Sequence, residues 1–200
     1  MNRHYTRREF IALAAAFSAL LAIDPACRQI PGETGPSEQS QAVVGLARSG
    51  DVEQMVRKAI ELTGGFPFLQ PNDTVLLKPN VNSGDPFPAT TNPAVVAAVV
   101  KVVREHSPKR VIVADHSNPN TGPTVANMKK VGIYEAALQA GAEAIGLEDE
   151  EWRRVAPGGA SHWQGGFRVS KLIFEVDHLI TLPVVKTHYI ASYSMALKNT

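Results

Sequence analysis

Thr74-Val75-Leu76-Leu77-Lys78-Pro79-Asn80 is the stretch that decides the fold of this 200-residue chain. Three consecutive apolar residues leave the segment no polar face, which is typical of a strand covered on both sides. Val111-Ile112-Val113-Ala114-Asp115 has the same character, and so does Leu179-Ile180-Thr181-Leu182. Each run is followed at once by polar or charged residues. We therefore predict three buried strands whose carboxyl ends carry polar side chains.

Helical patterns separate these strands. Asp51 and Gln54 form a capping box, and apolar residues then recur at helical spacing until Gly64-Gly65. Asn92 is the expected cap of a second helix, with Pro93 at its first position. Strands that alternate with helices predict an α/β fold with a mainly parallel, Rossmann-like sheet and helices on both faces.

Weaker segments complete this prediction. Ala42 to Ala47 is a short strand candidate, and Ala144-Ile145-Gly146-Leu147 is a further one. Gly122-Pro123 starts another helical stretch that breaks near Gly132. Trp152 to Phe167 contains two Gly-Gly pairs and predicts a hairpin or an excursion from the sheet.

The N-terminus has the layout of an export signal. Thr6-Arg7-Arg8-Glu9-Phe10-Ile11 precedes a run of 14 uncharged residues, Phe10 to Ile23. This run is too short for a helix crossing a bilayer core of about 30 Å. We predict a twin-arginine signal peptide over residues 1–26, recognised by the twin-arginine translocation machinery. The alternative is a first helix of the domain.

The predicted signal places the protein outside the cytoplasm, in the periplasm. An uncleaved signal or a lipidated Cys27 would tether it to the membrane. Residues 27–41 are rich in Pro, Gly, Ser, Glu and Gln and predict a flexible linker. Residues 42–200 then form one α/β domain.

Composition excludes some functions. Three of the 20 basic and two of the 19 acidic residues precede Cys27, so the remainder is formally neutral. Without a basic run, a nucleic-acid partner is not expected. Cys27 is the single cysteine, so this chain forms no internal disulfide and ligates no iron–sulfur cluster.

Five ordered motifs resemble a known family. The motifs are Leu76-Leu77-Lys78-Pro79-Asn80, Ala89-Thr90-Thr91-Asn92-Pro93, Val111-Ile112-Val113-Ala114-Asp115, Leu182-Pro183-Val184-Val185-Lys186-Thr187-His188 and Ala196-Leu197-Lys198-Asn199. Together they resemble domain-of-unknown-function family 362 (DUF362) over roughly Ala42 to Thr200. The resemblance implies no defined activity. Relatives usually continue beyond the Lys-Asn motif, so we expect a truncated domain, incomplete at its C-terminus.

The strand ends supply the candidate site. Parallel strands present their carboxyl ends at one edge, where α/β proteins bind ligands. Lysines there would attract a carboxylate or a phosphate, helped by the amino end of the helix that begins after Asn92. The predicted ligand-binding residues are Lys78, Asn80, Thr90, Thr91, Ser117, Lys198 and Asn199. The predicted catalytic residues are Asp115, Lys186 and His188, with Asp115 or His188 as general base and a lysine stabilising negative charge.

The sequence leaves open whether the site binds a metal and whether the protein is an enzyme. Asp115, His116 and His188 are candidate ligands of a divalent metal, although each is also an ordinary turn or surface residue. The chain lacks the glycine motifs of common hydrolases, P-loop NTPases and nicotinamide enzymes. We therefore expect an exported protein that binds a small anion, as an enzyme acting on it. The alternatives are a non-catalytic binding or accessory protein for a redox partner, and an inactive remnant.

Overall fold

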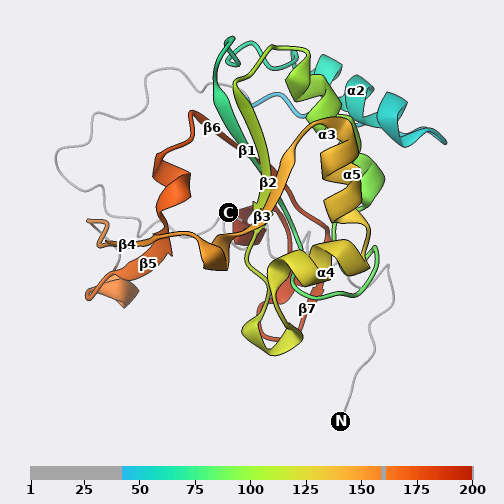
Figure 1. Ribbon diagram of the computed structural model, residues 1–200. Coiled ribbons are helices and arrows are strands. Elements are labelled where there is room, and N and C mark those ends of the chain that lie inside the picture. The colour runs from blue at the N-terminus through green and yellow to red at the C-terminus, as the bar shows by residue number, and fades with distance from the viewer. Residues whose placement is uncertain (1–41, 159–160, 200) are drawn as a thin grey trace, which may run out of the picture. The chain divides into compact units, whose positions relative to one another are not determined.

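A four-stranded parallel sheet forms the centre of the domain (Figure 1). The computed structural model describes residues 42–158 and 161–199, and residues Val43–Thr200 form one compact unit. The strand order is β3-β2-β1-β6. The bounds are β1 Thr74–Pro79, β2 Arg110–Asp115, β3 Glu143–Gly146 and β6 His178–Leu182. The predicted α/β fold with a parallel sheet is confirmed.

The two central strands are the apolar runs that the sequence indicates. In β1, Val75, Leu76 and Leu77 have no exposed surface, and Ile112 and Val113 of β2 have none either. Leu77 aligns with Val113 of β2 on one side and with Ile180 of β6 on the other. This register brings the ends of β1, β2 and β6 to a common edge.

Three α-helices cover one face of the sheet (Figure 1). They are α2 (Val52–Leu62), α3 (Pro93–Arg104) and α5 (Ile133–Ala140), with α4 (Thr124–Lys130) leading into α5. The predicted caps are confirmed, because Asp51 accepts a hydrogen bond from the Gln54 amide and Asn92 accepts one from the Ala94 amide. Valines of α3 pack on the odd-numbered side chains of β1 and β2 and form the larger core.

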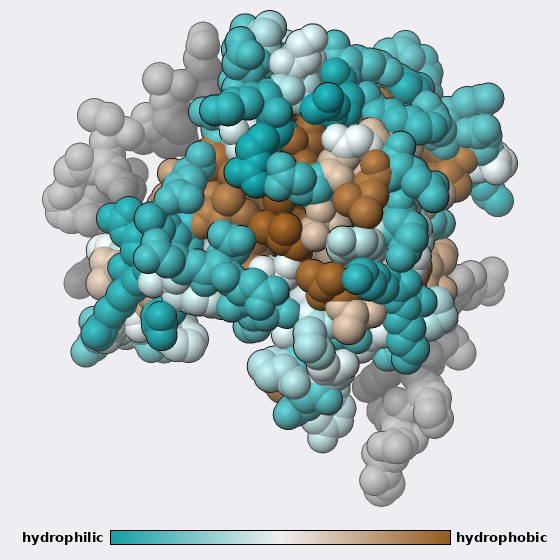
Figure 2. Space-filling view, viewed as in Figure 1, coloured by the Kyte–Doolittle hydropathy of each residue, from teal (hydrophilic) through white to brown (hydrophobic). Residues whose placement is uncertain are grey.

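The opposite face has a thinner cover. Leu76, Ile112 and Ala114 point to this side. They pack against Leu147 of the 3-10 helix η2 (Leu147–Asp149) and Leu172 of η4 (Lys171–Phe174). Figure 2 shows apolar surface in the middle of the view, bordered by polar side chains. Short 3-10 helices therefore replace the long helices that bury the first face.

Two hairpins project from the sheet. The first pairs β4 (Trp152–Val155) with β5 (Phe167–Ser170), as predicted for this glycine-rich segment. The second pairs β7 (Lys186–His188) with β8 (Ser192–Ser194) and leads to α6 (Ala196–Asn199). We did not predict the second hairpin, because three-residue strands leave no periodic pattern.

The predicted strand at Ala42–Ala47 is wrong. These residues form no strand, and Val43, Val44 and Leu46 are largely exposed. The segment precedes α2 in the sequence and lies beside that helix instead of at a sheet edge. Gly45 is so close to the Ala59 carbonyl that a side chain there would collide with it. The predicted signal peptide and linker lie outside the described residues. Within those residues, no helix is long and apolar enough to cross a membrane.

Glu148 caps the amino end of α4, although it lies 24 residues after Thr124 in the sequence. Its carboxylate accepts hydrogen bonds from the Thr124 amide at 2.6 Å and the Thr124 hydroxyl at 2.7 Å. Burial raises the pKa of Glu148, but the bonds from Thr124, the backbone amide of Glu148 and the nearby His116 together lower it, so the pKa is below its usual value. This bond also fixes Thr124, whose hydroxyl oxygen accepts from the Ser117 amide next to β2.

Glu148→Gln should lower the free energy of unfolding by about 1 kcal/mol at pH 7, the usual effect of losing a helix cap. Because the folded-state pKa is lowered, the contribution is complete above the ordinary pKa of 4.5 and is lost as pH falls through the lowered pKa. Urea unfolding from pH 7 to pH 3 measures this difference. Asp149→Asn, at an exposed neighbour, should change little. A Glu148→Gln effect that persists undiminished at pH 3 would contradict the assignment.

Candidate functional site

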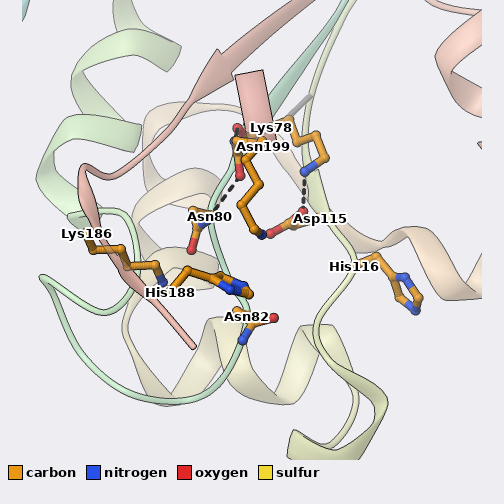
Figure 3. Close-up of a pocket in the computed structure, with 9 residues that line it drawn as sticks. Lys78, Asn80, Asn82, Asp115, His116, Lys186, His188 and Asn199 are labelled. Atoms are coloured by element: carbon orange, nitrogen blue, oxygen red, sulfur yellow. Dashed lines mark hydrogen bonds and ion pairs between the residues drawn. The ribbon is translucent and has the colours of Figure 1, made fainter. Parts of the chain in front are cut away.

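The carboxyl edge of the sheet encloses a polar hollow of about 150 Å³ (Figure 3). Strands β1, β2 and β7, the segment after β1, and α6 all contribute side chains to it. Its lining residues are Lys78, Asn80, Asn82, Asp115, His116, Lys186, His188, Lys198 and Asn199. The structure thus brings together three polar clusters that lie far apart in the sequence.

Lys78 and Asp115 form a largely buried ion pair across β1 and β2. Lys78 Nζ lies 2.7 Å from Asp115 Oδ1, and the two side chains are only 16% and 7% exposed. The second oxygen, Asp115 Oδ2, accepts the Val81 amide at 2.6 Å. Both carboxylate oxygens are therefore engaged, so Asp115 as placed positions Lys78 and the chain after β1.

A chain of side-chain bonds supports the end of β1. The backbone N–H of Asn80 donates to the Thr91 hydroxyl oxygen at 2.8 Å, and that hydroxyl donates to the Leu182 carbonyl at 2.7 Å. Asn199 Nδ2 donates to the Lys78 carbonyl at 3.0 Å. Since Leu182 ends β6 and Asn199 lies in α6, these bonds fasten β1 to two later elements.

Strand β7 brings Lys186 and His188 to the hollow (Figure 3). Lys186 Nζ donates to the Ala89 carbonyl. Burial and then the nearby charge of Lys198 lower the pKa of Lys186 below the ordinary lysine value of 10.5. His188 Nδ1 accepts the amides of Ile190 at 3.2 Å and Ala191 at 3.1 Å. Nδ1 must therefore carry a lone pair, and a neutral His188 ring holds its proton on Nε2.

The charge of the hollow is positive. Lys78, Lys186 and Lys198 face a single carboxylate, Asp115. Within the described part of the chain, neither Lys186 nor Lys198 has a carboxylate at ion-pair distance. Asp115 and Asp85 act on Lys186 only from beyond ion-pair distance. The two lysines beside amide groups therefore make this edge attractive to an anion.

Several residues that we predicted to bind a ligand do not line the hollow. Thr90 donates to the Asp85 carbonyl at 3.0 Å, and Ser117 donates to the Val81 carbonyl at 2.6 Å. Like Thr91, they are buried and hold the backbone instead of lining the hollow. Their predicted contact with a ligand is therefore not supported by their placement.

His116 and the α3 terminus also differ from expectation. His116 turns away from the other labelled side chains and packs edge-on against Trp152, with ring centroids 5.4 Å apart (Figure 3). In the described ranges, no three His, Cys, Asp or Glu side chains are grouped so that they could hold a metal ion. Asn92, at the start of α3, lines a separate, mainly apolar hollow with Phe87 and Val185.

Asn82 is the lining residue that sequence reasoning missed. It follows Asn80 by two residues, in the polar segment after β1. Its backbone carbonyl accepts the Asn118 amide at 3.1 Å and the Thr121 hydroxyl at 2.8 Å. Proximity to Asn80 was the available signal, but the sequence does not show that the chain turns back into the hollow here.

The family comparison covers this site. A family model described as "Domain of unknown function (DUF362)" matches residues 75–200. The chain belongs to the DUF362 family. The matched range begins in β1 and contains every residue that lines the hollow. It begins later than the Ala42 start that we expected, although α2 packs into the same core as the matched elements.

One relative extends this comparison. The Thylakoid-associated protein sll1697 of Synechocystis sp. (strain ATCC 27184 / PCC 6803 / Kazusa) is 30% identical over 154 residues. The alignment covers 76% of this chain and 46% of the relative, so the chain spans about half the length of that curated protein. No solved structure matches the chain.

The ion pair of Lys78 and Asp115 should dominate the stability of this edge. Removal of one partner leaves the other buried and uncompensated, so Lys78→Met and Asp115→Asn should each cost about 3 kcal/mol of unfolding free energy. The double variant should lose clearly less than the sum, because both charges are then gone. Urea unfolding of the four proteins gives the coupling free energy.

The exposed pair Arg110 and Glu143 provides the matched control. Its atoms lie 2.6 Å apart, but the side chains are 44% and 51% exposed, so its coupling should stay below about 1 kcal/mol. Equal coupling in the two pairs would contradict the central place given to Lys78 and Asp115.

Proposed function

We propose that this DUF362 domain binds a small anionic ligand in the polar hollow at the carboxyl edge of its sheet. The excess of lysines over carboxylates in the hollow is the observation that carries the proposal. Lys186 and Lys198, which form no ion pair within the described residues, supply the positive charge, and His188 adds an Nε2–H donor. The hollow is small, so a ligand of few heavy atoms fits best.

The same donors could also act on the ligand. Lys186 and His188 would stabilise negative charge that develops on a bound oxygen, as donors in a preformed site do. Asp115 is the lining carboxylate, and both its oxygens are already bonded. This favours binding and polarisation over proton abstraction by Asp115, and keeps a non-catalytic binding protein as the alternative.

Lys186→Met should weaken oxalate binding about tenfold to a hundredfold, because a charge-assisted hydrogen bond contributes about 1.5–3 kcal/mol. Oxalate keeps its two charges across the alkaline range, so the pH dependence of its affinity reports on the protein. Since the pKa of Lys186 is lowered, wild-type affinity should fall as pH rises through that pKa, below the ordinary 10.5. Titration calorimetry from pH 6 to pH 10 measures both effects.

Lys109→Met is the control for loss of one positive charge. Lys109 is exposed and precedes β2 at the opposite, amino edge of the sheet. The Lys109→Met substitution should leave oxalate affinity unchanged at moderate salt, because separated surface charges are screened. Oxalate binding that is absent in the wild type, or equally affected by Lys109→Met, would overturn the proposed anion site.

We also propose that the protein is exported through the twin-arginine pathway and works in the periplasm or at a membrane surface. The adjacent Arg7 and Arg8 before an uncharged run support this proposal. The name of the thylakoid-associated relative agrees with a membrane-linked location. An uncleaved signal or a lipid on Cys27 would provide the tether.

Replacement of Arg7 and Arg8 together by lysine should abolish export while keeping the charge of the segment. Cell fractionation with an antibody against the domain should then find the protein in the cytoplasm. Arg3→Lys is the matched control and should not change its distribution. Undiminished export of the double variant would exclude this pathway.

A further inference from the structure

The carboxamide oxygen of Asn80 is a buried acceptor that lacks a partner. Asn80 is 7% exposed, and its Oδ1 has almost no contact with solvent and no hydrogen bond in the described structure. Ser170 and Ser194 also have unpartnered oxygens, but neither lines the hollow. A buried acceptor left without a donor costs free energy, so its retention at a site calls for an explanation.

Neighbouring bonds fix the orientation of this amide. Asn199 Nδ2 donates to the carbonyls of Lys78 at 3.0 Å and Pro79 at 3.4 Å, so the other terminal atom of Asn199 must be its oxygen. That oxygen accepts Asn80 Nδ2 at 3.3 Å. A flipped Asn80 would place two oxygens against each other. The Asn80 oxygen therefore faces away from Asn199, toward the side where Lys186 and His188 lie (Figure 3).

The hollow thus combines a buried acceptor that has no partner among the described residues with several donors. Lys186, Lys198 and the Nε2–H of His188 suit the oxygens of an anion, whereas Asn80 Oδ1 would repel them. A ligand that satisfies both must carry a hydrogen-bond donor close to its negative charge. An ammonium donor is disfavoured by the surrounding lysines, so the donor that fits is a hydroxyl group.

On the basis of the proposed anion binding, we propose that the ligand is a small hydroxycarboxylate and that Asn80 is the residue that selects it. The carboxylate contacts Lys186 and Lys198, and the neighbouring hydroxyl donates to Asn80 Oδ1. Because Asn80 Oδ1 has almost no exposed surface, this bond requires the side chains around it to move aside when the ligand binds. A plain carboxylate leaves Asn80 unpartnered and binds more weakly, as sites built around a substrate hydroxyl discriminate strongly against analogues without one.

Glycolate and fluoroacetate test this selection, because they differ in one group and fluorine cannot donate. Titration calorimetry on the full chain at pH 7 should show glycolate binding at least about tenfold more tightly than fluoroacetate. Asn80→Ala should reduce this ratio to less than about threefold. Asn120→Ala, which removes an exposed carboxamide that does not line the hollow, should retain the wild-type ratio.

The outcomes separate the two proposals. If the wild type binds glycolate and fluoroacetate equally well, the selection by Asn80 is wrong while anion binding stands. An unchanged ratio in folded Asn80→Ala has the same meaning. If the wild type binds glycolate, fluoroacetate and oxalate not at all, the anion site itself fails. The wild-type ratio decides the question even if Asn80→Ala does not fold, and Asn199→Ala, which frees the Asn80 amide to flip, should then lower the ratio as well.

Discussion

The carboxylate of Asp115 is the interaction on which the carboxyl edge depends. It neutralises Lys78 at the end of β1 and accepts the Val81 amide just beyond that strand. Without it, a largely buried ammonium would face Lys186 and Lys198 with no counter-ion in the hollow. One buried anion therefore lets three cations gather at one edge, and two of them keep charge available for a ligand.

This arrangement divides the polar residues of the edge into two groups. Asp115, Thr91, Ser117 and Asn199 use their hydrogen bonds to fasten β1 to β2, β6 and α6. Lys186 and His188 keep N–H donors beyond those bonds, and Asn80 keeps its carboxamide oxygen as an acceptor. Because the first group fixes the backbone, the second can present donors and an acceptor in a defined geometry, which is what selective recognition requires.

Much of this could be predicted from the sequence. Continuous apolar runs identified β1, β2 and β6, and the rule that parallel strands end at one edge placed Lys78, Asp115 and Lys186 near one another. The strand predicted for Ala42–Ala47 was wrong, because an apolar composition does not show whether a partner strand exists. The roles of Thr90, Thr91 and Ser117 depend on backbone carbonyls that are distant in sequence, and the free oxygen of Asn80 depends on the orientation of Asn199. No local pattern encodes these contacts.

The bond between Asn80 and Asn199 joins residues 119 positions apart. Contacts of such long range form late, because closure of a long loop carries a large entropic cost. Folding of β1, α3 and β2 alone therefore gives part of the sheet without the Asn199 contact that orients Asn80. The recognition site is therefore complete only once α6 has docked against the end of β1.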